Sequence, residues 1–251
     1  MQWDDTGFVL AARRHGEHGL IAEVLTCEHG RHLGFVRGGQ SPRLRALWQT
    51  GNEVAAHWQG RLPEHLGNFG CELVRAHAAR FLDDALRLAA LAAASALAAA
   101  LPEREPHADL FAAFGRLLGA LDSRADWPQC YVSWECELLA GLGFGLDLGR
   151  CAVTGATEDL AYVSPKSGRA VSRAAGLPYH DKLLPLPAFL WRGVGAGRDE
   201  LAAGLRLTGY FLQRHVFAPQ GRPLPEARSF FADRLCRRAA AAMVGAEEGH
   251  E

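Results

Sequence analysis

Hydrophobic and polar positions alternate in short runs over residues 1–80, as they do in half-buried β-strands. Val54, Ala56 and Trp58 alternate with their neighbours directly after the turn at Gly51 and Asn52. Further strands are predicted at 7–13, 20–26, 33–36 and 72–77. Five short strands with turns between them fit a small closed barrel such as an OB-fold.

The strands at 20–26 and 33–36 are predicted to pair as a hairpin. The segment between them, 28–31, contains Gly30, which can take the positive φ of a tight connection. The second strand leads into residues 38–45, which contain two glycines and a proline and are expected to form a flexible loop.

From residue 81 onward the apolar residues recur at helical spacing. Residues 81–101 are rich in alanine and predict a buried helix, and a second apolar stripe follows at 110–121. Asp126 as N-cap and Pro128 in the first turn predict a third helix, whose aromatic residues are expected in the core rather than around a cofactor.

The remaining chain divides into a loop-rich part and further helices. Residues 145–197 are rich in loops, with a short strand near 160–163, and helices are predicted at 201–216 and 225–243. The pattern therefore predicts an α+β fold in four segments. They are an OB-fold domain (1–80), a helical domain (81–148), a loop-rich segment (149–197) and C-terminal helices that pack on the helical domain (198–251).

The charge pattern indicates one local basic surface on a balanced protein. The formal net charge is -1, yet residues 29–52 contain four arginines and no acid. A hairpin that leads into a basic loop suits contact with a phosphate backbone, and arginine suits bidentate contact with phosphate. The alternative is a solvated hairpin edge whose arginines only protect against pairing with other strands.

Metal and disulfide chemistry find little support in the sequence. The six cysteines lack paired spacing, and His29 and His32 lack a third ligand. Positions 151, 154, 172 and 175 have the spacing of a four-cysteine zinc knuckle, but only Cys151 is a cysteine. We expect no zinc and no other cofactor, and we expect hydrogen bonds and packing to maintain the turns of this segment instead.

Membrane and enzyme classes are also disfavoured. The longest uncharged apolar run, 88–101, is shorter than the roughly 20 residues of a membrane span, and the first residues lack the apolar segment of a signal peptide. No catalytic triad, carboxylate pair or phosphate-cradling glycine loop occurs at suitable spacing. We expect a cytoplasmic protein that is not an enzyme.

Several motifs in a fixed order resemble the RecO family of bacterial recombination mediators. They are the opening strand 7–10, the strand 17–26, the turn 28–31, the basic loop after Gly38, the helix end 141–144, the run 151–168 and the helix 205–215. The resemblance implies an OB-fold, a helical domain and an embedded zinc-finger-like loop. Many members of the family keep four cysteines in that loop, so any property of the family that depends on metal does not transfer to this chain.

The resemblance also implies a function in DNA repair and homologous recombination. A member of this family is expected to bind single- and double-stranded DNA and to anneal complementary strands. It is also expected to bind RecR and the C-terminal tail of single-stranded DNA-binding protein (SSB), and thereby to help load RecA. During repair it would associate with the nucleoid.

Seven arginines are the candidate DNA contacts. Arg31, Arg37, Arg43 and Arg45 are the main predicted phosphate contacts, and Arg13, Arg14 and Arg61 are predicted to support them. Phe35 and Trp48 lie near the basic loop and are either base-stacking residues or core residues.

A different class of protein remains open, namely a non-catalytic scaffold whose helical domain binds a partner tail. An acidic tail with a hydrophobic end would need an apolar pocket beside one or two arginines, and Arg116 and Arg124 flank suitable helices.

Overall fold

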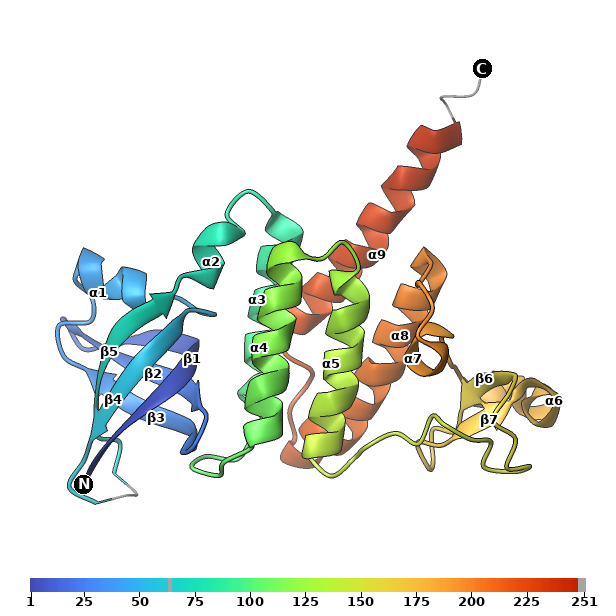
Figure 1. Ribbon diagram of the computed structural model, residues 1–251, viewed down its shortest axis with the longest axis horizontal. Coiled ribbons are helices and arrows are strands. Elements are labelled where there is room, and N and C mark those ends of the chain that lie inside the picture. Colours follow the sequence, from blue (N-terminus) through green and yellow to red (C-terminus); the bar gives the residue numbers. More distant parts are fainter. Residues whose placement is uncertain (63–64, 248–251) are drawn as a thin grey trace. The chain divides into compact units, whose positions relative to one another are not determined.

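The computed structural model describes residues 1–62 and 65–247, with side chains up to residue 237 (Figure 1). The fold is α+β, as predicted. The chain forms two compact units, the first comprising Met1–Arg124 with Pro225–Arg228 and the second the remaining residues from Ala125 onward. This grouping is coarser than the four predicted segments, whose boundaries remain a prediction.

The first unit opens with five strands that form a closed barrel in the order β1-β2-β3-β5-β4 (Figure 1). The strands are β1 (Gln2–His15), β2 (Gly19–Thr26), β3 (Gly30–Val36), β4 (Glu53–Gln59) and β5 (Asn68–Arg75). Neighbours are antiparallel except β3 and β5, which meet in parallel at Phe35 and Asn68. This arrangement is that of an OB-fold. All five predicted strands are present, but β1 is longer than predicted, β3 begins at Gly30 and β5 begins at Asn68, earlier than predicted.

Local sequence accounts for the strands and their turns. In β4, Val54, Ala56 and Trp58 are buried in the barrel core and the residues between them face outward. Gly30, in the turn between β2 and β3, has φ of +69°. A Cβ atom there would lie 2.2 Å from the carbonyl oxygen of Glu105, so both the turn and the close approach of that segment require glycine.

The predicted flexible loop at 38–45 is only partly a loop, because the short helix α1 (Pro42–Leu47) begins inside it. Pro42 lies in the first turn, where its fixed φ favours a helix and its missing N–H does no harm. Trp48 follows α1 and is 2% exposed in the barrel core, with its ring 5.8 Å from that of Phe69. The arginines of this segment are therefore held on a helix that is anchored to the barrel.

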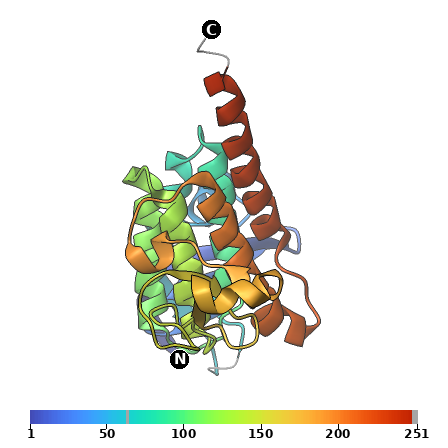
Figure 2. The same ribbon diagram turned by 90° about the vertical axis from the view of Figure 1, so that its right-hand side faces the viewer.

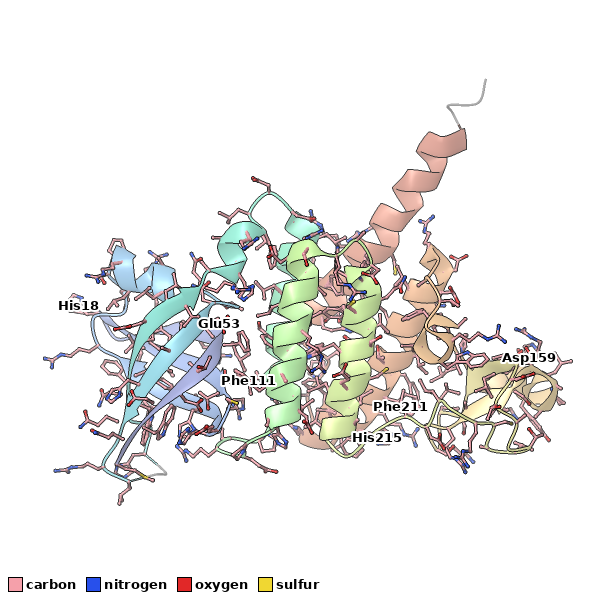
Figure 3. All side chains as sticks on the ribbon, viewed as in Figure 1. His18, Glu53, Phe111, Asp159, Phe211 and His215 are labelled. Carbon is pink, nitrogen blue, oxygen red and sulfur yellow. The ribbon has the colours of Figure 1, made fainter. Side chains whose placement is uncertain are left out.

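Three further helices follow the barrel in the first unit: α2 (His77–Arg80), α3 (Ala85–Ala98) and α4 (Ala108–Ser123). The helix predicted from residue 81 begins later, because the carboxylate of Asp84 accepts hydrogen bonds from the N–H groups of Leu86 and Arg87 and so caps α3. Phe8 of the barrel packs against α4, with its ring 4.9 Å from that of Phe111 (Figure 3).

The second unit contains the remaining helices and a small three-stranded sheet. Its elements are α5 (Trp127–Gly141), β6 (Leu160–Val163), β7 (Ala170–Ser172), α6 (Arg173–Gly176), β8 (Leu184–Pro185), α7 (Phe189–Arg192) and α8 (Arg198–Phe211). α8 continues as a π-helical turn over Leu212–Phe217, and short 3₁₀ turns occur at Leu177–Lys182 and Ala218–Gln220. Figure 2 shows the last helix, α9 (Glu226–Glu247), as one continuous element.

The aromatic residues of α5 form part of the core, as predicted. Trp127, Tyr131 and Trp134 are all buried, and the ring of Tyr131 lies 4.4 Å from that of Phe231. In the part of the chain that the structure describes, no helix is long and apolar enough to cross a membrane.

The knuckle-like segment keeps its turns without four thiolates. The Sγ atom of Cys151 accepts a hydrogen bond from the N–H of Ser172 at 3.3 Å, and the N–H of Gly155 donates to the carbonyl of Cys151 at 2.9 Å. Burial alone would raise the pKa of Cys151, but hydrogen bonds from Ser172 and Thr154 outweigh it and lower the pKa to about 6. Hydrogen bonds thus join three of the four knuckle positions. A zinc-finger-like role for this segment remains a prediction.

Candidate nucleic-acid interface

Strand register gathers several arginines at one end of the barrel. Arg14 pairs with Leu20 and Leu20 pairs with Val36, so these residues form one row across three strands, and Arg37 follows directly. Arg43 and Arg45 lie on α1. We call Arg13, Arg14, Arg37, Arg43 and Arg45 together the basic end; His18, in the neighbouring hairpin turn, is labelled in Figure 3.

Gln40 ties the two halves of the basic end together. Its backbone N–H donates to the carbonyl of His18 at 3.2 Å, and its side-chain amide donates to the carbonyls of Gly16 and Gly19 at 3.0 and 3.1 Å. The turn after β3 is thereby fixed against the β1–β2 hairpin. Sequence reasoning missed this residue, because a single glutamine in a glycine-rich turn carries no signal of its distant acceptors.

A cavity of about 180 Å³ lies between the strands and α1 at this end. It is lined by Ala12, Arg14, Leu20, Gln40, Arg45 and Trp48. Leu20 and Trp48 are buried, whereas Arg14 and Arg45 are exposed. Two arginines that are thirty-one positions apart in sequence thus line one small space.

The five arginines of the basic end are all exposed. Among the side chains that the structure describes, in residues 1–62 and 65–237, none forms an ion pair or a hydrogen bond with any of these guanidinium groups, and no backbone hydrogen bond to them is found in the described chain. Their positive charge is therefore directed to solvent, where it is available to an anionic partner.

Arg31 has different surroundings from those we expected. Its side chain is only 14% exposed, and its Nη1 atom lies 2.5 Å from Oε1 of Glu23. Its Nε atom donates to the carbonyl of Leu101 at 2.6 Å, and Nη2 lies 3.5 Å from Glu103. These contacts hold the segment after α3 against β3, so this guanidinium has little capacity left for a phosphate. We therefore leave Arg31 out of the interface.

Arg61 is exposed but lies away from the basic end. Gly60 and Met1 exchange hydrogen bonds, and Gln59 pairs with Gln2 at the start of β1. Arg14 is near the other end of the same fourteen-residue strand. A DNA contact at Arg61 would therefore be separate from the main cluster.

The outer face of the barrel beside the basic end carries an aromatic side chain. Arg13, Ile21 and Phe35 form a row across β1, β2 and β3. The ring of Phe35 is partly exposed and meets the ring of His15 edge-on at 6.0 Å. Phe35 thus remains a candidate for base stacking, whereas Trp48 belongs to the core.

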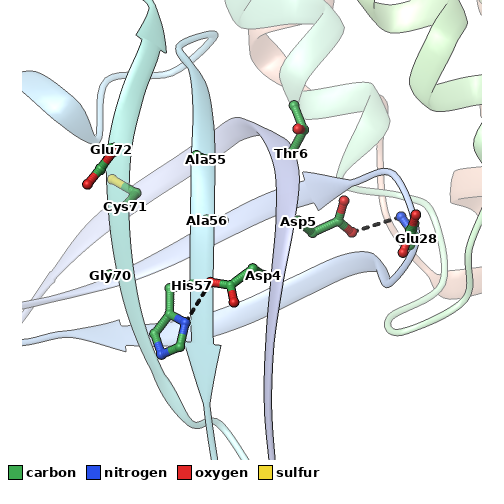
Figure 4. A pocket seen from close by; sticks show the side chains of 10 residues that line it. All are labelled: Asp4, Asp5, Thr6, Glu28, Ala55, Ala56, His57, Gly70, Cys71 and Glu72. Carbon is green, nitrogen blue, oxygen red and sulfur yellow. Dashed lines mark hydrogen bonds and ion pairs between the residues drawn. The ribbon is translucent and has the colours of Figure 1, made fainter.

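A second hollow on the barrel has the opposite charge. It measures about 770 Å³ and is lined by Asp4, Asp5, Thr6, Glu28, Ala55, Ala56, His57, Gly70, Cys71 and Glu72 (Figure 4). Asp4 pairs with His57 at 2.8 Å, and Asp5 accepts a hydrogen bond from the N–H of Glu28. Four carboxylates among the lining residues make this hollow unfavourable for a phosphate backbone.

The histidine pair predicted not to bind metal lies in an aromatic cluster. His29 stacks on Trp3 with ring centroids 4.3 Å apart, and its Nδ1 atom lies 3.0 Å from Asp5. Burial lowers the pKa of His32, whose ring meets Trp3 edge-on. Among the described residues, no group of three His, Cys, Asp or Glu side chains could hold a metal ion.

These features define a class: an OB-fold protein with one basic barrel end, followed by a helical region. Comparison with protein families refines that assignment. The profile described as "Recombination protein O N terminal" matches residues 1–76, and "Recombination protein O C terminal" matches residues 82–223. The chain belongs to the RecO family of DNA repair and recombination proteins, as its sequence motifs predicted.

Curated relatives support the same family over nearly the whole length. The DNA repair protein RecO of Rhodospirillum rubrum is 53% identical over 249 residues, which cover 96% of this chain and 99% of the relative. Those of Phenylobacterium zucineum and Caulobacter sp. are 51% and 48% identical, and each match covers 94% of this chain and 98% of the relative.

Proposed function

We propose that the protein is a non-catalytic recombination mediator that binds single- and double-stranded DNA through the basic end of its barrel. It anneals complementary strands and, with RecR, helps load RecA onto SSB-coated single-stranded DNA. It acts in the cytoplasm and associates with the nucleoid during repair. The observation that supports DNA binding is the group of five exposed guanidinium groups, free of acidic partners within the described chain, at one end of an OB-fold.

Binding would be electrostatic and largely independent of sequence. Each arginine that neutralises a phosphate releases condensed counterions, so affinity falls as salt rises. Phe35 adds a partly exposed ring on which a base can stack. The acidic groove over β1, β4 and β5 keeps the backbone away from that side and so restricts the path of the strand.

Annealing requires that one protein screen two phosphate backbones at once. Arg13 and Arg14 are adjacent in β1, and adjacent residues of a strand point to opposite faces. The basic end therefore carries cations on the outer face, beside Phe35, and on the side of the cavity. This arrangement suits two strands better than a single line of cations would.

The test measures binding and annealing by the full chain. Two complementary oligonucleotides with fluorescent labels should anneal faster with protein than without, and raised salt should weaken both binding and annealing. A variant with all five basic-end arginines changed to glutamine should lose most of both activities, while Arg61→Gln should lose little. No ATP hydrolysis should accompany the reaction. A wild-type chain that neither binds nor anneals DNA would overturn the proposal.

Binding of a partner tail by the second unit is a second candidate function. Phe144 is 39% exposed and stacks on His215 at 5.0 Å, and His215 in turn lies parallel to Phe211 (Figure 3). Arg214 is adjacent and pairs with Tyr210. The exposed ring of Phe144 suits the hydrophobic end of an acidic tail, such as that of SSB, and Arg214, next to His215 in sequence, is a candidate partner for its acidic part. Arg116 and Arg124 are exposed on and directly after α4, and each interacts with another group of the protein.

Fluorescence polarisation with a labelled tail peptide tests this candidate. Phe144→Ala should weaken peptide binding and leave binding of bare DNA unchanged. Equal affinity of the variant and the wild type for the peptide would place the tail elsewhere.

A further inference from the structure

We propose that Arg14 and Arg45 together hold one phosphate group of a nucleic acid in the cavity that they line. The basic end would then contain one discrete phosphate site with two guanidinium groups, in addition to arginines that each contact the backbone separately. This inference rests on the proposed DNA-binding function and specifies how part of that site works.

The size of the cavity fits a small anion. Its volume of about 180 Å³ is below the roughly 300–1,000 Å³ of pockets that enclose a whole small molecule. It is about six times the roughly 30 Å³ that one water molecule occupies in the liquid. A phosphate group fits such a space, whereas a complete nucleotide does not.

The charges around the cavity favour an anion. Arg14 and Arg45 bring two positive charges to one space, and neither is paired with an acid in the described chain. Ala12, Leu20 and Trp48 form an apolar lining, which reduces the screening of charge by water. A phosphate between the two guanidinium groups relieves their mutual repulsion and accepts charge-assisted hydrogen bonds from both.

The two arginines are held by rigid parts of the barrel. Arg14 lies in β1 and pairs with Leu20, while Arg45 lies on α1, which Trp48 anchors in the core. Gln40 fixes the intervening turn to the hairpin through the carbonyls of Gly16 and Gly19. Because both amide hydrogens of Gln40 are used in this way, we assign it a positioning role. A site that is assembled before binding loses less freedom when the phosphate arrives.

The chain provides a matched control for each arginine. Arg13 precedes Arg14 but points to the opposite face of β1. Arg43 lies two positions before Arg45 on α1, and residues two apart do not share a helix face. Both control arginines are exposed, and neither lines the cavity. Because all four residues are arginines, R13Q/R43Q and R14Q/R45Q change the net charge equally and differ only in their relation to the cavity.

The first test is the dependence of single-stranded DNA affinity on salt. Each phosphate contact contributes about 0.7 to the slope of log affinity against log salt. If Arg14 and Arg45 share one phosphate, R14Q/R45Q flattens the slope by about 0.7, and the effects of the two single changes on affinity are not additive. Two separate contacts would instead flatten it by about 1.4, and that result, or no change, would overturn the inference. The effects of R13Q and R43Q on affinity for single-stranded DNA should be additive.

The second test detects the site without DNA. Wild-type protein and both double variants are labelled with 5-fluorotryptophan, and the ¹⁹F resonance of Trp48 is assigned through Trp48→Phe. Inorganic phosphate should shift this resonance in the wild type and in R13Q/R43Q but not in R14Q/R45Q. A shift in all three proteins, or in none, would contradict the site. Unchanged melting temperatures establish that the variants are folded.

The source of the phosphate and the underlying function are tested separately. Oligonucleotides with and without a 5′-phosphate bind equally if the site takes an internal backbone phosphate, and the phosphorylated one binds more tightly if it takes a strand end. Additive effects of R14Q and R45Q on intact DNA binding would overturn this inference alone. Absence of DNA binding by the wild type would overturn the proposed function, and inorganic phosphate would still test the cavity.

Discussion

The guanidinium of Arg31 lies 2.5 Å from the carboxylate of Glu23, and both side chains are largely buried. The same guanidinium also donates to the carbonyl of Leu101. One arginine therefore joins β2 and β3 to the segment that follows α3. This arrangement makes Arg31 a residue of the fold, although its sequence neighbourhood is that of the basic end.

Arg31→Gln is accordingly expected to destabilise the protein without changing its DNA contacts. Removal of one partner of a buried ion pair leaves the other charge unpaired, so the free energy of unfolding should fall by about 3 kcal/mol. Arg37→Gln, at an exposed position, should change it by less than about 0.5 kcal/mol. Urea unfolding measures both values, and salt titration of DNA binding should show a flatter slope only for Arg37→Gln. A flatter slope for Arg31→Gln at unchanged stability would restore Arg31 to the interface.

Replacing Arg43 and Arg45 together by glutamate should weaken binding to single-stranded DNA while the fold remains intact. Both residues are exposed on α1, and that helix packs against the barrel core through Leu44 and Leu47 instead. If both contact phosphate, the slope of log affinity against log salt should flatten by about 1.4. The new carboxylate at position 45 would also neutralise Arg14 across the cavity. An unchanged slope with an unchanged melting temperature would mean that α1 faces away from DNA.

The purified protein should contain no stoichiometric zinc. Thr154, Ser172 and Ala175 occupy three of the four knuckle positions and cannot supply thiolates. Hydrogen bonds to Cys151 link the turns instead. Elemental analysis of protein prepared without chelator measures the metal content. About one zinc per chain would contradict this expectation and would point to histidine ligands.

Acid should destabilise the first unit through two buried histidines. Burial lowers the pKa of both His32 and His77 below the ordinary value of 6.5. The folded state therefore stays unprotonated at a pH where the unfolded chain already binds protons. Stability is fully present above about pH 6.5 and falls as the pH drops below that value.

Urea unfolding at about pH 7.5 and pH 5.5 measures this loss. At the higher pH the variant H32Q/H77Q should be less stable than the wild type, because two buried rings are removed. When the pH is lowered, however, it should lose less stability than the wild type does. His18→Gln is the control, because it replaces an exposed histidine. The stability of this variant should depend on pH in the same way as that of the wild type. Equal losses in H32Q/H77Q and in the wild type would assign the acid sensitivity to other groups.

Features that depend on neighbouring residues were determined by the sequence alone. These features are the alternation in β4, the glycine at position 30, the apolar spacing of α4 and α5, and the proline in the first turn of α5. Each acts over a few residues, and the elements concerned formed as predicted. The order of motifs along the chain was sufficient to indicate the RecO family. The start of α3 and the helix inside the loop at 38–45 were missed, although Asp84 and Pro42 carry local signals for both.

Only the tertiary structure decided which arginines form a common surface. In the sequence Arg31 lies within the basic run, but Glu23 and Leu101 occupy its guanidinium. Arg14 lies outside that run, yet strand register and α1 bring it to the same cavity as Arg45. The physical reason is that periodicity reports the face of an element, whereas burial and charge pairing depend on residues that are distant in sequence and meet only when the barrel closes.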